Sequence, residues 1–349
     1  MTCPFPPNER HFRYRIMVDR IPSGTRDVLP DEMRELRAMT DRIRGVFEGA
    51  GYGEIYTPAL EYEGTFSREE RGSAQSSSWA TRPAYRLFDE QGNVLVLRPD
   101  TTIPIARLVA TRYAHAEPPF RFCYFAHAYR GVRPQRGQSR ELLQAGVELI
   151  GSGAPEGTAE ALSVLCAALD AAGLENYRVG LGDASLYPGL LEALGVEPDA
   201  RERILAALVD GNFVGVERAV TELGLAPADA ELLLAVPRTR GGPEVIADLS
   251  GPLEDAAMGL REVHALLTPQ VAERVIFDLG LVRSLGYYTG AVFQVYDPAY
   301  GVPIGTGGRY DELLAGFGRP LPAVGFALNV ERLHIALTGE ERGRRGGGR

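Results

Sequence analysis

The sequence predicts an α+β fold in which a mainly antiparallel sheet is flanked by helices and carries a helical insertion. Strand-like runs arrive mostly as hairpins, which disfavours an open parallel α/β sheet. Between residues 186 and 270 helical periodicity dominates and strand signals almost disappear. The chain has 349 residues, 45% of them hydrophobic, so it can bury a sizeable core as one large domain with an insertion or as two domains.

The first half of the chain predicts strands interleaved with helices. After a leader over residues 1–20, helical spacing of apolar side chains predicts a helix over roughly 31–50. The run GYGEIYTPALE predicts a strand that ends at a proline, and YRLFDEQGNVLVLRPD predicts a hairpin whose turn contains a left-handed position. Threonines are expected to open a helix at TTIPIARLVATRYA, and FRFCYFAHAYRG and LLQAGVELIGSG predict two more strands. A helix from about 158 to 173 and the strand YRVGLGD complete this half.

Beyond the insertion the sequence returns to strands. RVIFDLG, YYTGAVFQVYD and PIGTGGRYDE have the composition of strands, and PAVGFALNVERLHIAL predicts a strand that runs into a helix. The polar and glycine-rich tail over residues 339–349 is expected to be disordered. The core is therefore expected to comprise residues 21–185 and 271–338, with residues 186–270 as the insertion.

Composition and charge exclude several classes of function. The net charge of -9 and the pI near 5.3 provide no basic field for a polyanion, so nucleic acid is disfavoured as the main partner. The sequence has no apolar run of the length that a membrane span needs, and its first residues are too charged for a signal peptide, which predicts a cytoplasmic protein. The chain contains no lysine, which excludes lysine Schiff bases and a Walker-type phosphate lysine.

Neither a metal nor an organic cofactor is expected. Cys3, Cys123 and Cys166 are far apart and lack metal-ligand spacing, so reduced thiols are predicted. The five histidines are scattered along the chain. The sequence also lacks a P-loop, a GxGxxG turn between strand and helix, and a GxSxG elbow, so neither hydride transfer nor triad hydrolysis is supported.

Four segments concentrate polar side chains beside glycines: LRPDTT, YRGVRPQRGQSREL, LVRSLGYYTG and GTGGRYDEL. One such segment is more often a solvated loop, and Arg283 alone could be a cation at a strand edge. Together they complement a small zwitterion, because Asp100 can pair with an ammonium, Gln144 with a ring nitrogen or an amine, and Arg283 with a carboxylate or phosphate. The aromatic rings of Tyr287, Tyr288 and Tyr310 would form flat apolar walls, and their hydroxyl groups would add polar contacts. The segments predict a pocket for an amino acid, which a phosphate site could adjoin.

In these segments the sequence resembles the catalytic domain of histidyl-tRNA synthetases, a class II family, over nearly all of residues 21–338. LVRSLGYYTGAVF and GTGGRYDELL are similar to the two histidine-specific signatures of that family. GYGEIYTPALE resembles motif 1, which forms dimers, FAHAYRGVRPQRGQSRELLQ resembles motif 2, and AVGFALNVERL resembles motif 3. The resemblance implies a class II synthetase-like core that associates with itself through motif 1.

The resemblance also implies roles for individual residues. Asp100 stands where the synthetases place a glutamate that binds the histidine α-amino group, and Arg283 matches an arginine near the histidine carboxylate and the ATP phosphate. The other implied histidine contacts are Thr102, Gln144, Tyr287, Tyr288 and Tyr310. Arg130 and Arg332 match the arginines of motifs 2 and 3 that hold ATP.

Four departures from the synthetase pattern affect the implied ATP site. Val132 replaces a motif 2 glutamate that helps to hold adenine, and Gln138 stands where a second phosphate-contacting arginine is expected. Gly286 replaces an aspartate before the tyrosine pair, and Asn329 replaces a motif 3 glycine, where a side chain would crowd adenosine. A lost charge-assisted contact costs roughly 1.5–3 kcal/mol, so the changes together are expected to abolish adenylation. The sequence also stops soon after motif 3, where synthetases continue into an anticodon-binding domain.

A kept histidine pocket beside a degraded ATP site resembles the regulatory subunits of ATP phosphoribosyltransferase, the first enzyme of histidine biosynthesis. The resemblance implies a chain without catalytic residues that assembles with a short catalytic subunit into a hetero-octamer, is required for activity and takes part in feedback inhibition by L-histidine. Two alternatives stay open. One is a histidine-activating ligase, either a truncated histidyl-tRNA synthetase or a paralogue, and the other is a histidine sensor with a different partner.

Overall fold

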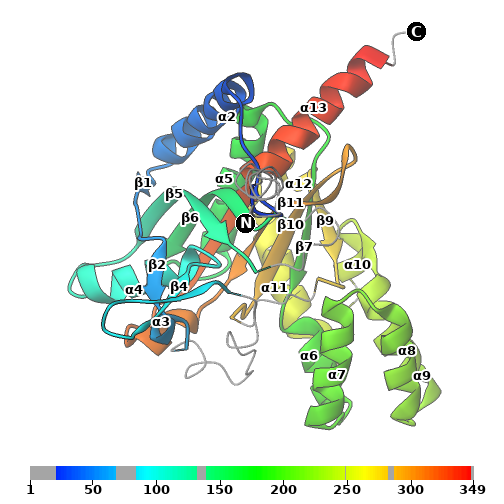
Figure 1. The fold of residues 1–349 in the computed structure, drawn as a ribbon. Helices are drawn as coiled ribbons and strands as arrows, with labels where there is room; N and C mark the ends of the chain where they lie inside the picture. The colour runs from blue at the N-terminus through cyan, green and yellow to red at the C-terminus, as the bar shows by residue number, and fades with distance from the viewer. Residues whose placement is uncertain (1–20, 68–83, 132–138, 248, 282–286, 347–349) are drawn as a thin grey trace, which may run out of the picture.

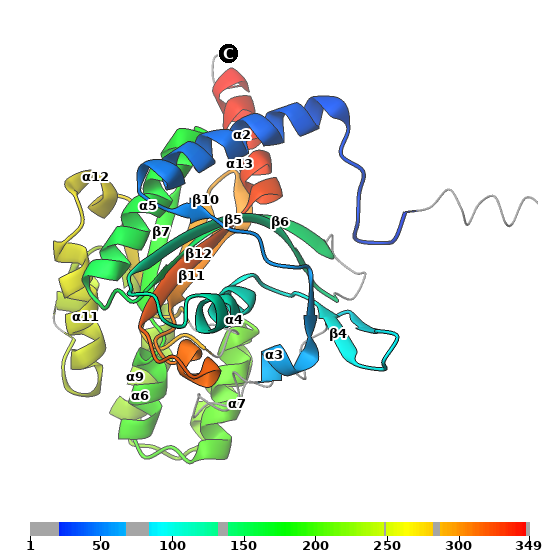
Figure 2. The same ribbon diagram turned by 90° about the vertical axis from the view of Figure 1, so that its left-hand side faces the viewer.

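The computed structural model describes residues 21–67, 84–131, 139–247, 249–281 and 287–346. Its centre is a nine-stranded sheet with the order β1-β5-β6-β12-β11-β10-β7-β9-β8 (Figures 1 and 2). Among the described strands, β1–β5 and β7–β9 pair in parallel and the other neighbours pair antiparallel, which confirms the mainly antiparallel sheet. The bounds are β1 Gly53–Glu54, β5 Phe120–Tyr129, β6 Glu141–Ile150, β7 Arg178–Asp183, β8 Arg240–Gly241, β9 Val275–Asp278, β10 Ala291–Asp297, β11 Tyr300–Arg309 and β12 Ala323–Asn329.

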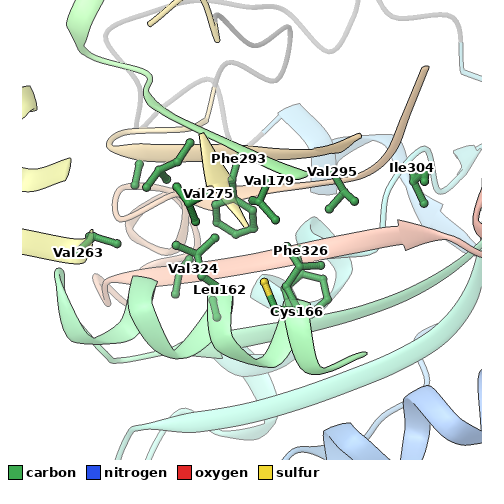
Figure 3. Packing of buried hydrophobic residues seen from close by; sticks show 14 of the residues in the cluster. Leu162, Cys166, Val179, Val263, Val275, Phe293, Val295, Ile304, Val324 and Phe326 are labelled. Carbon is green, nitrogen blue, oxygen red and sulfur yellow. The ribbon is translucent and has the colours of Figure 1, made fainter. Parts of the chain in front are cut away.

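One face of this sheet is apolar and carries the core. Because side chains alternate along each strand, a row of buried residues crosses six neighbouring strands on this face, and five of them supply an apolar side chain. The row consists of Cys123, Val147, Phe326, Phe293 and Leu181, with Gly307 between the two phenylalanines. Figure 3 shows Phe293 and Phe326 beside Leu162 and Cys166 of the helix that covers them.

Three helices cover the apolar face, as Figure 2 shows: α2 (Pro30–Gly49), α5 (Glu156–Ala172) and α13 (Val330–Gly346). Helix α2 confirms the helix predicted near residues 31–50. It begins with a proline at its first position, where no backbone donor is needed. Its apolar stripe turns toward the sheet and buries Leu36, Met39, Ile43 and Phe47.

A smaller antiparallel sheet lies on the other side of the main sheet, with the order β2-β4-β3. Its strands are β2 (Leu60–Tyr62), β3 (Arg86–Phe88) and β4 (Val94–Leu97). The hairpin predicted around DEQGN is confirmed, and Gly92 takes the left-handed position with φ +82°. Three short helical elements accompany this sheet: α3 (Glu63–Ser67), α4 (Thr102–Arg112) and η5 (Leu313–Phe317).

The segment between β7 and β9 is helical apart from the two residues of β8. In Figure 1 its first four helices form an arm that extends from the sheet on the side away from α2 and α13. None of the helices in the described part of the chain has the length and apolar composition of a membrane span. The helical elements are α6 Leu186–Ala193, α7 Pro198–Val209, α8 Phe213–Glu222, α9 Pro227–Ala235, η3 Val236–Arg238, α10 Glu244–Ala247, η4 Gly251–Leu253, α11 Glu254–Ala265 and α12 Pro269–Ala272.

Two expectations about the ends of elements differ from the structure. The run GYGEIYTPALE was predicted as a strand that ends at Pro58, but β1 ends already at Glu54, and a second short strand, β2, begins after the proline at Leu60. The tail expected to be disordered from residue 339 continues α13 as far as Gly346. Glu340 explains this, since its buried carboxylate accepts the backbone N–H groups of Glu175 and Asn176. The expected leader over residues 1–20 lies outside the described residues.

Candidate functional site

The second face of the main sheet, opposite the core, is lined by small and polar residues. Strand alternation brings five glycines of β6, β7, β11 and β12 to this face: Gly146, Gly180, Gly182, Gly308 and Gly325. A Cβ at Gly146 would meet the Tyr124 ring, and a Cβ at Gly308 would lie 2.8 Å from the ring of Tyr288. The missing side chains therefore leave space above the sheet for tyrosine rings and for the acid described next.

Glu148 is the buried acid at the centre of this face, with 1% of its surface exposed. The Thr102 hydroxyl donates to its Oε1 at 2.7 Å, and the Tyr310 hydroxyl donates to its Oε2. Burial raises the pKa of Glu148 to about 8, although both hydrogen bonds lower it, and the charge of Asp100 raises it further. The carboxyl can consequently gain or lose a proton near neutral pH.

Asp100 lies at the start of α4, near Glu148. The helix was expected to be opened by threonines, yet Thr101 makes no capping side-chain hydrogen bond. Instead Oδ1 of Asp100 accepts the backbone N–H of Ile103 at 3.2 Å. The carboxylate is thus held at a helix N-terminus, where negative charge is favoured, and is 7% exposed.

Arg98 fixes the segment that leads into Asp100. Its buried guanidinium donates to the carbonyl oxygen of His127 at 2.8 Å and to Oγ1 of Thr57 at 3.0 Å. These bonds tie β4 to strand β5 and to the segment between β1 and β2. Burial lowers the pKa of Arg98, although guanidinium stays charged at any ordinary pH.

Gln144 lies on the same face as Glu148, four residues earlier on β6, opposite Ala126 and Asn329. Its side chain is 8% exposed, and Oε1 has no hydrogen-bond partner among the described residues. A buried amide oxygen without a partner is costly. It is therefore available to a ligand that enters this face.

Three tyrosines enclose the polar groups. The ring centroids of Tyr287 and Tyr288 are 4.9 Å apart, and those of Tyr287 and Tyr310 are 5.7 Å apart with an edge-to-face arrangement. Tyr287 and Tyr310 belong to a second buried cluster with Phe122 and Tyr124. Burial and the neighbouring Glu148 raise the pKa of Tyr310 well above its ordinary value, so its hydroxyl remains a donor.

The structure thus gathers the predicted residues Asp100, Thr102, Tyr287, Tyr288 and Tyr310 near Glu148, and places Gln144 on the same face four residues away along β6. Arg283 lies outside the described residues, as do Val132, Gln138 and Gly286. Glu148 was missed at the sequence level, although strand alternation from Gln144 would have placed it on the same face. Among the described residues no group of histidine, cysteine, aspartate and glutamate side chains could hold a metal ion.

Comparison with known proteins identifies the family of the chain. A sequence profile of the histidyl-tRNA synthetase family matches residues 24–333. The chain is 43% identical over 323 residues to an ATP phosphoribosyltransferase regulatory subunit of Symbiobacterium thermophilum, covering 91% of this chain and 79% of that protein. The chain belongs to the family of ATP phosphoribosyltransferase regulatory subunits, which have a histidyl-tRNA synthetase-like fold.

Solved structures support the same family. A crystal structure from Bacillus halodurans, titled ATP phosphoribosyltransferase regulatory subunit/histidyl-tRNA synthetase, is 34% identical with a TM-score of 0.82 and covers 91% of this chain and 83% of that chain. A histidine–tRNA ligase subunit from Alicyclobacillus acidocaldarius is also 34% identical, with a TM-score of 0.74 and coverages of 93% and 98%. Both matches confirm the class II synthetase-like core that the sequence predicted.

The positions that the resemblance assigned to an ATP site make contacts within the chain. Arg332 donates from Nη1 to the carbonyl oxygen of Pro303 at 2.7 Å. Asn329 accepts the backbone N–H of Arg332 at 2.8 Å and so caps the start of α13. Arg130 follows β5, and its backbone N–H donates to the carbonyl oxygen of Arg140 at 2.8 Å. Asn329 therefore contributes to the helix start at the position where the synthetase pattern has a glycine.

Proposed function

We propose that this regulatory subunit binds L-histidine on the small-residue face and adjusts a separate catalytic subunit of ATP phosphoribosyltransferase to the histidine concentration. Glu148 carries the proposal. A buried carboxyl whose pKa lies near 8 can donate a hydrogen bond to an imidazole nitrogen when protonated, and can accept one or pair with imidazolium when ionised. Few ligands other than an imidazole offer both kinds of partner over the same pH range.

The remaining polar groups suit the amino acid part of that ligand. The carboxylate of Asp100 complements an α-ammonium group, and Oε1 of Gln144 can accept a further N–H. The tyrosine walls exclude water, which strengthens each of these interactions. In this proposal Arg283 would meet the ligand carboxylate.

Regulation requires that histidine bind the assembly states with different affinities. We place phosphoribosyl transfer on a short-form catalytic subunit and none on this chain, within a cytoplasmic hetero-octamer. Nothing in the chain's charge of -9 favours nucleic acid as a further partner.

Self-association is proposed through the motif 1 region. The small sheet and the segment before it expose a group of large apolar side chains: Tyr56, Leu60, Tyr62, Leu87 and Phe88. Phe88 is 75% exposed and Tyr56 77%. Strand pairing places Leu60, Tyr62 and Leu87 on one face of the small sheet. Exposed apolar side chains gathered on one face are typical of a protein interface, so two copies of the chain would pack this face together.

The second candidate function is a histidine-activating ligase, which the retained arginines at positions 130 and 332 favour. Two observations disfavour it: the Arg332 guanidinium that would hold ATP is engaged with the carbonyl oxygen of Pro303, and Asn329 puts a side chain where the synthetase pattern has a glycine. Histidine-dependent exchange of pyrophosphate into ATP would support the ligase. Its absence at millimolar histidine would remove it.

Calorimetric titration with L-histidine tests the proposed function, together with an assay of phosphoribosyl transfer. The expected result is saturable binding that does not depend on ATP, with activation of the catalytic subunit by this chain and inhibition on adding histidine. Gln144→Leu should weaken binding, whereas Gln91→Leu in the exposed β3–β4 turn should leave it unchanged. A chain that neither bound histidine nor changed the transfer rate would contradict the proposal.

A further inference from the structure

The last buried side chain that the structure describes on α13 is that of Glu340, which is 6% exposed. The next residues, 341–344, are exposed, and a Cβ at Gly343 would have no neighbouring atom within 4 Å. A Cβ at Gly339, in contrast, would lie 2.8 Å from Cβ of Ala299 in the turn between β10 and β11. The helix therefore contacts the β10–β11 turn at Gly339 and leaves the body of the fold directly after Glu340.

Two carboxyl groups meet at this contact. Asp297, at the end of β10, is 4% exposed, and its side chain forms a hydrogen bond with that of Glu340. Oδ1 of Asp297 accepts the backbone N–H of Ala299 at 2.7 Å, while the buried Oδ2 receives no hydrogen bond from an amide or hydroxyl group of the described residues. Ionised carboxylates can only accept hydrogen bonds. A bond between these two groups therefore requires that one of them carries a proton.

The other contacts of the two groups place this proton on Asp297. Both oxygens of Glu340 accept backbone N–H groups of the turn between α5 and β7, Oε2 from Glu175 at 3.1 Å and Oε1 from Asn176 at 2.7 Å. Burial opposes the ionisation of Glu340, yet these bonds lower its pKa. Burial raises the pKa of Asp297, and the Glu340 carboxylate raises it further, although the N–H of Ala299 lowers it.

The surrounding charges do not neutralise the pair. Among the described residues neither carboxyl forms an ion pair, because Arg344 pairs with Glu175 and Arg274 with Asp170. Ionisation of both groups would thus leave two negative charges in contact without a counterion. The ionisable side chains of the neighbouring segments are Glu175, Arg178, Arg274, Glu341, Arg342 and Arg344, with the phenols of Tyr296 and Tyr300.

We propose that the Asp297–Glu340 pair fixes the end of α13 to the body of the fold only while it holds a proton, so that the end of the helix detaches as the pH rises. The attached state keeps a proton that the detached state, with solvated carboxyls, releases, so attachment weakens above the ordinary range of an aspartate. Beyond Glu340 only the Arg344–Glu175 pair holds the described part of the helix, and both of its side chains are more than half exposed. This pH response goes beyond the proposed function and does not require histidine.

Hydrogen–deuterium exchange of the purified full chain, read by mass spectrometry, tests the inference. Protection factors, which remove the intrinsic dependence of exchange on pH, are measured from about pH 5 to about pH 9 for peptides that contain the end of α13 and the α5–β7 turn. In the wild type the protection of these peptides should fall roughly tenfold or more over this range. Constant protection in the wild type would overturn the inference.

The variant Asp297→Asn separates this pair from every other titrating group. Its amide keeps the shape of the protonated carboxyl, because the oxygen can accept from Ala299 and the NH₂ group can donate to Glu340 without losing a proton at high pH. Protection at the end of α13 should therefore be the same at both ends of the pH range. Glu148 is unchanged in this variant, so the difference from the wild type belongs to the pair. The matched control, Asp210→Asn at an exposed aspartate of the insertion, should keep the wild-type fall.

Glu340→Gln distinguishes a shared proton from a purely structural contact. This variant should lose protection at every pH, because an NH₂ group replaces one of the oxygens that accept backbone N–H groups of the α5–β7 turn. A contact without a proton would make Asp297→Asn and Glu340→Gln lose protection alike, and that result would overturn the inference. A fall of protection with pH in Asp297→Asn equal to that of the control would overturn it as well.

Discussion

The hydroxyl of Tyr310 donates a hydrogen bond to the carboxylate of Glu148 across 162 residues of sequence. Tyr310 directly follows β11 and Glu148 lies in β6, and β12 separates these two strands in the sheet. Gly325 of β12 pairs with Glu148 in the ladder, and a side chain there would collide with the Glu148 carboxyl. The bond across β12 therefore depends on a glycine in the strand between its two partners.

Replacing Glu148 by glutamine should weaken histidine binding at least tenfold, about 1.4 kcal/mol. The amide keeps the shape of the side chain but cannot ionise, so it loses the stronger interaction with an imidazolium ring. Calorimetry on folded protein checks the change, and Glu312→Gln, an exposed acid near Tyr310, serves as the control. Unchanged affinity in Glu148→Gln would show that histidine binds elsewhere.

The free energy of unfolding should fall as pH rises from about 5 to 8 because of Glu148. The pKa of its carboxyl is about 8 in the folded chain against the ordinary 4.5. Between these two values the native state keeps a proton that the unfolded chain has released. The free energy of unfolding therefore falls by up to about 1.4 kcal/mol per pH unit, until the carboxyl of the folded chain also ionises. Urea unfolding at several pH values measures the slope. Glu148→Gln should have a flatter slope than the wild type, and equal slopes would refute the assignment.

Gly325→Ala should destabilise the chain by roughly 1–3 kcal/mol, because the new methyl group overlaps the Glu148 carboxyl and the Val147 carbonyl oxygen. It should also impair histidine binding, since the carboxyl must move away from Tyr310. Gly189→Ala in α6 is the matched control. No other atom lies within 4 Å of a Cβ there, so the same substitution should be neutral or stabilise the helix by up to about 1 kcal/mol.

Tyr62→Arg should convert a self-associated form of the chain into monomers. The substitution places a charge on the exposed face that Tyr62 shares with Leu60 and Leu87, where it would lose its hydration in a packed interface. Sedimentation velocity measures the change. Val302→Arg, on an exposed part of β11, should leave the association state as it is. A Tyr62→Arg protein that sedimented like the wild type would place self-association on another face.

Local patterns were sufficient for most of the fold. The spacing of apolar residues in α2 predicts which face of the helix packs against the sheet. The turn residues between β3 and β4 predict the hairpin. The early end of β1 at Glu54 was not predicted, since the sequence pattern continued the strand to Pro58. The helix and the hairpin could be predicted because the physics that decides them acts within a few residues.

The site was predictable only in part, because its chemistry depends on contacts between distant segments. Glu148 lies in the apolar run GVELI and owes its raised pKa to burial beneath segments far away in the sequence. Asn329 was expected to crowd a nucleotide, and its helix cap becomes visible only with the backbone of α13 in place. The identity of a residue suggests what it can bind, but its partners decide what it does.

The carboxylate of Glu340 links α13 by hydrogen bonds to the turn that joins α5 to β7. It accepts the N–H groups of Glu175 and Asn176 at 3.1 and 2.7 Å, and Arg344 adds an ion pair with Glu175 at 2.7 Å. A protein shortened at residue 338, where the composition turns polar, would lose all three contacts. Truncating the chain where its apolar sequence ends should therefore destabilise it, because the polar last turns of α13 bind this helix to the turn before β7.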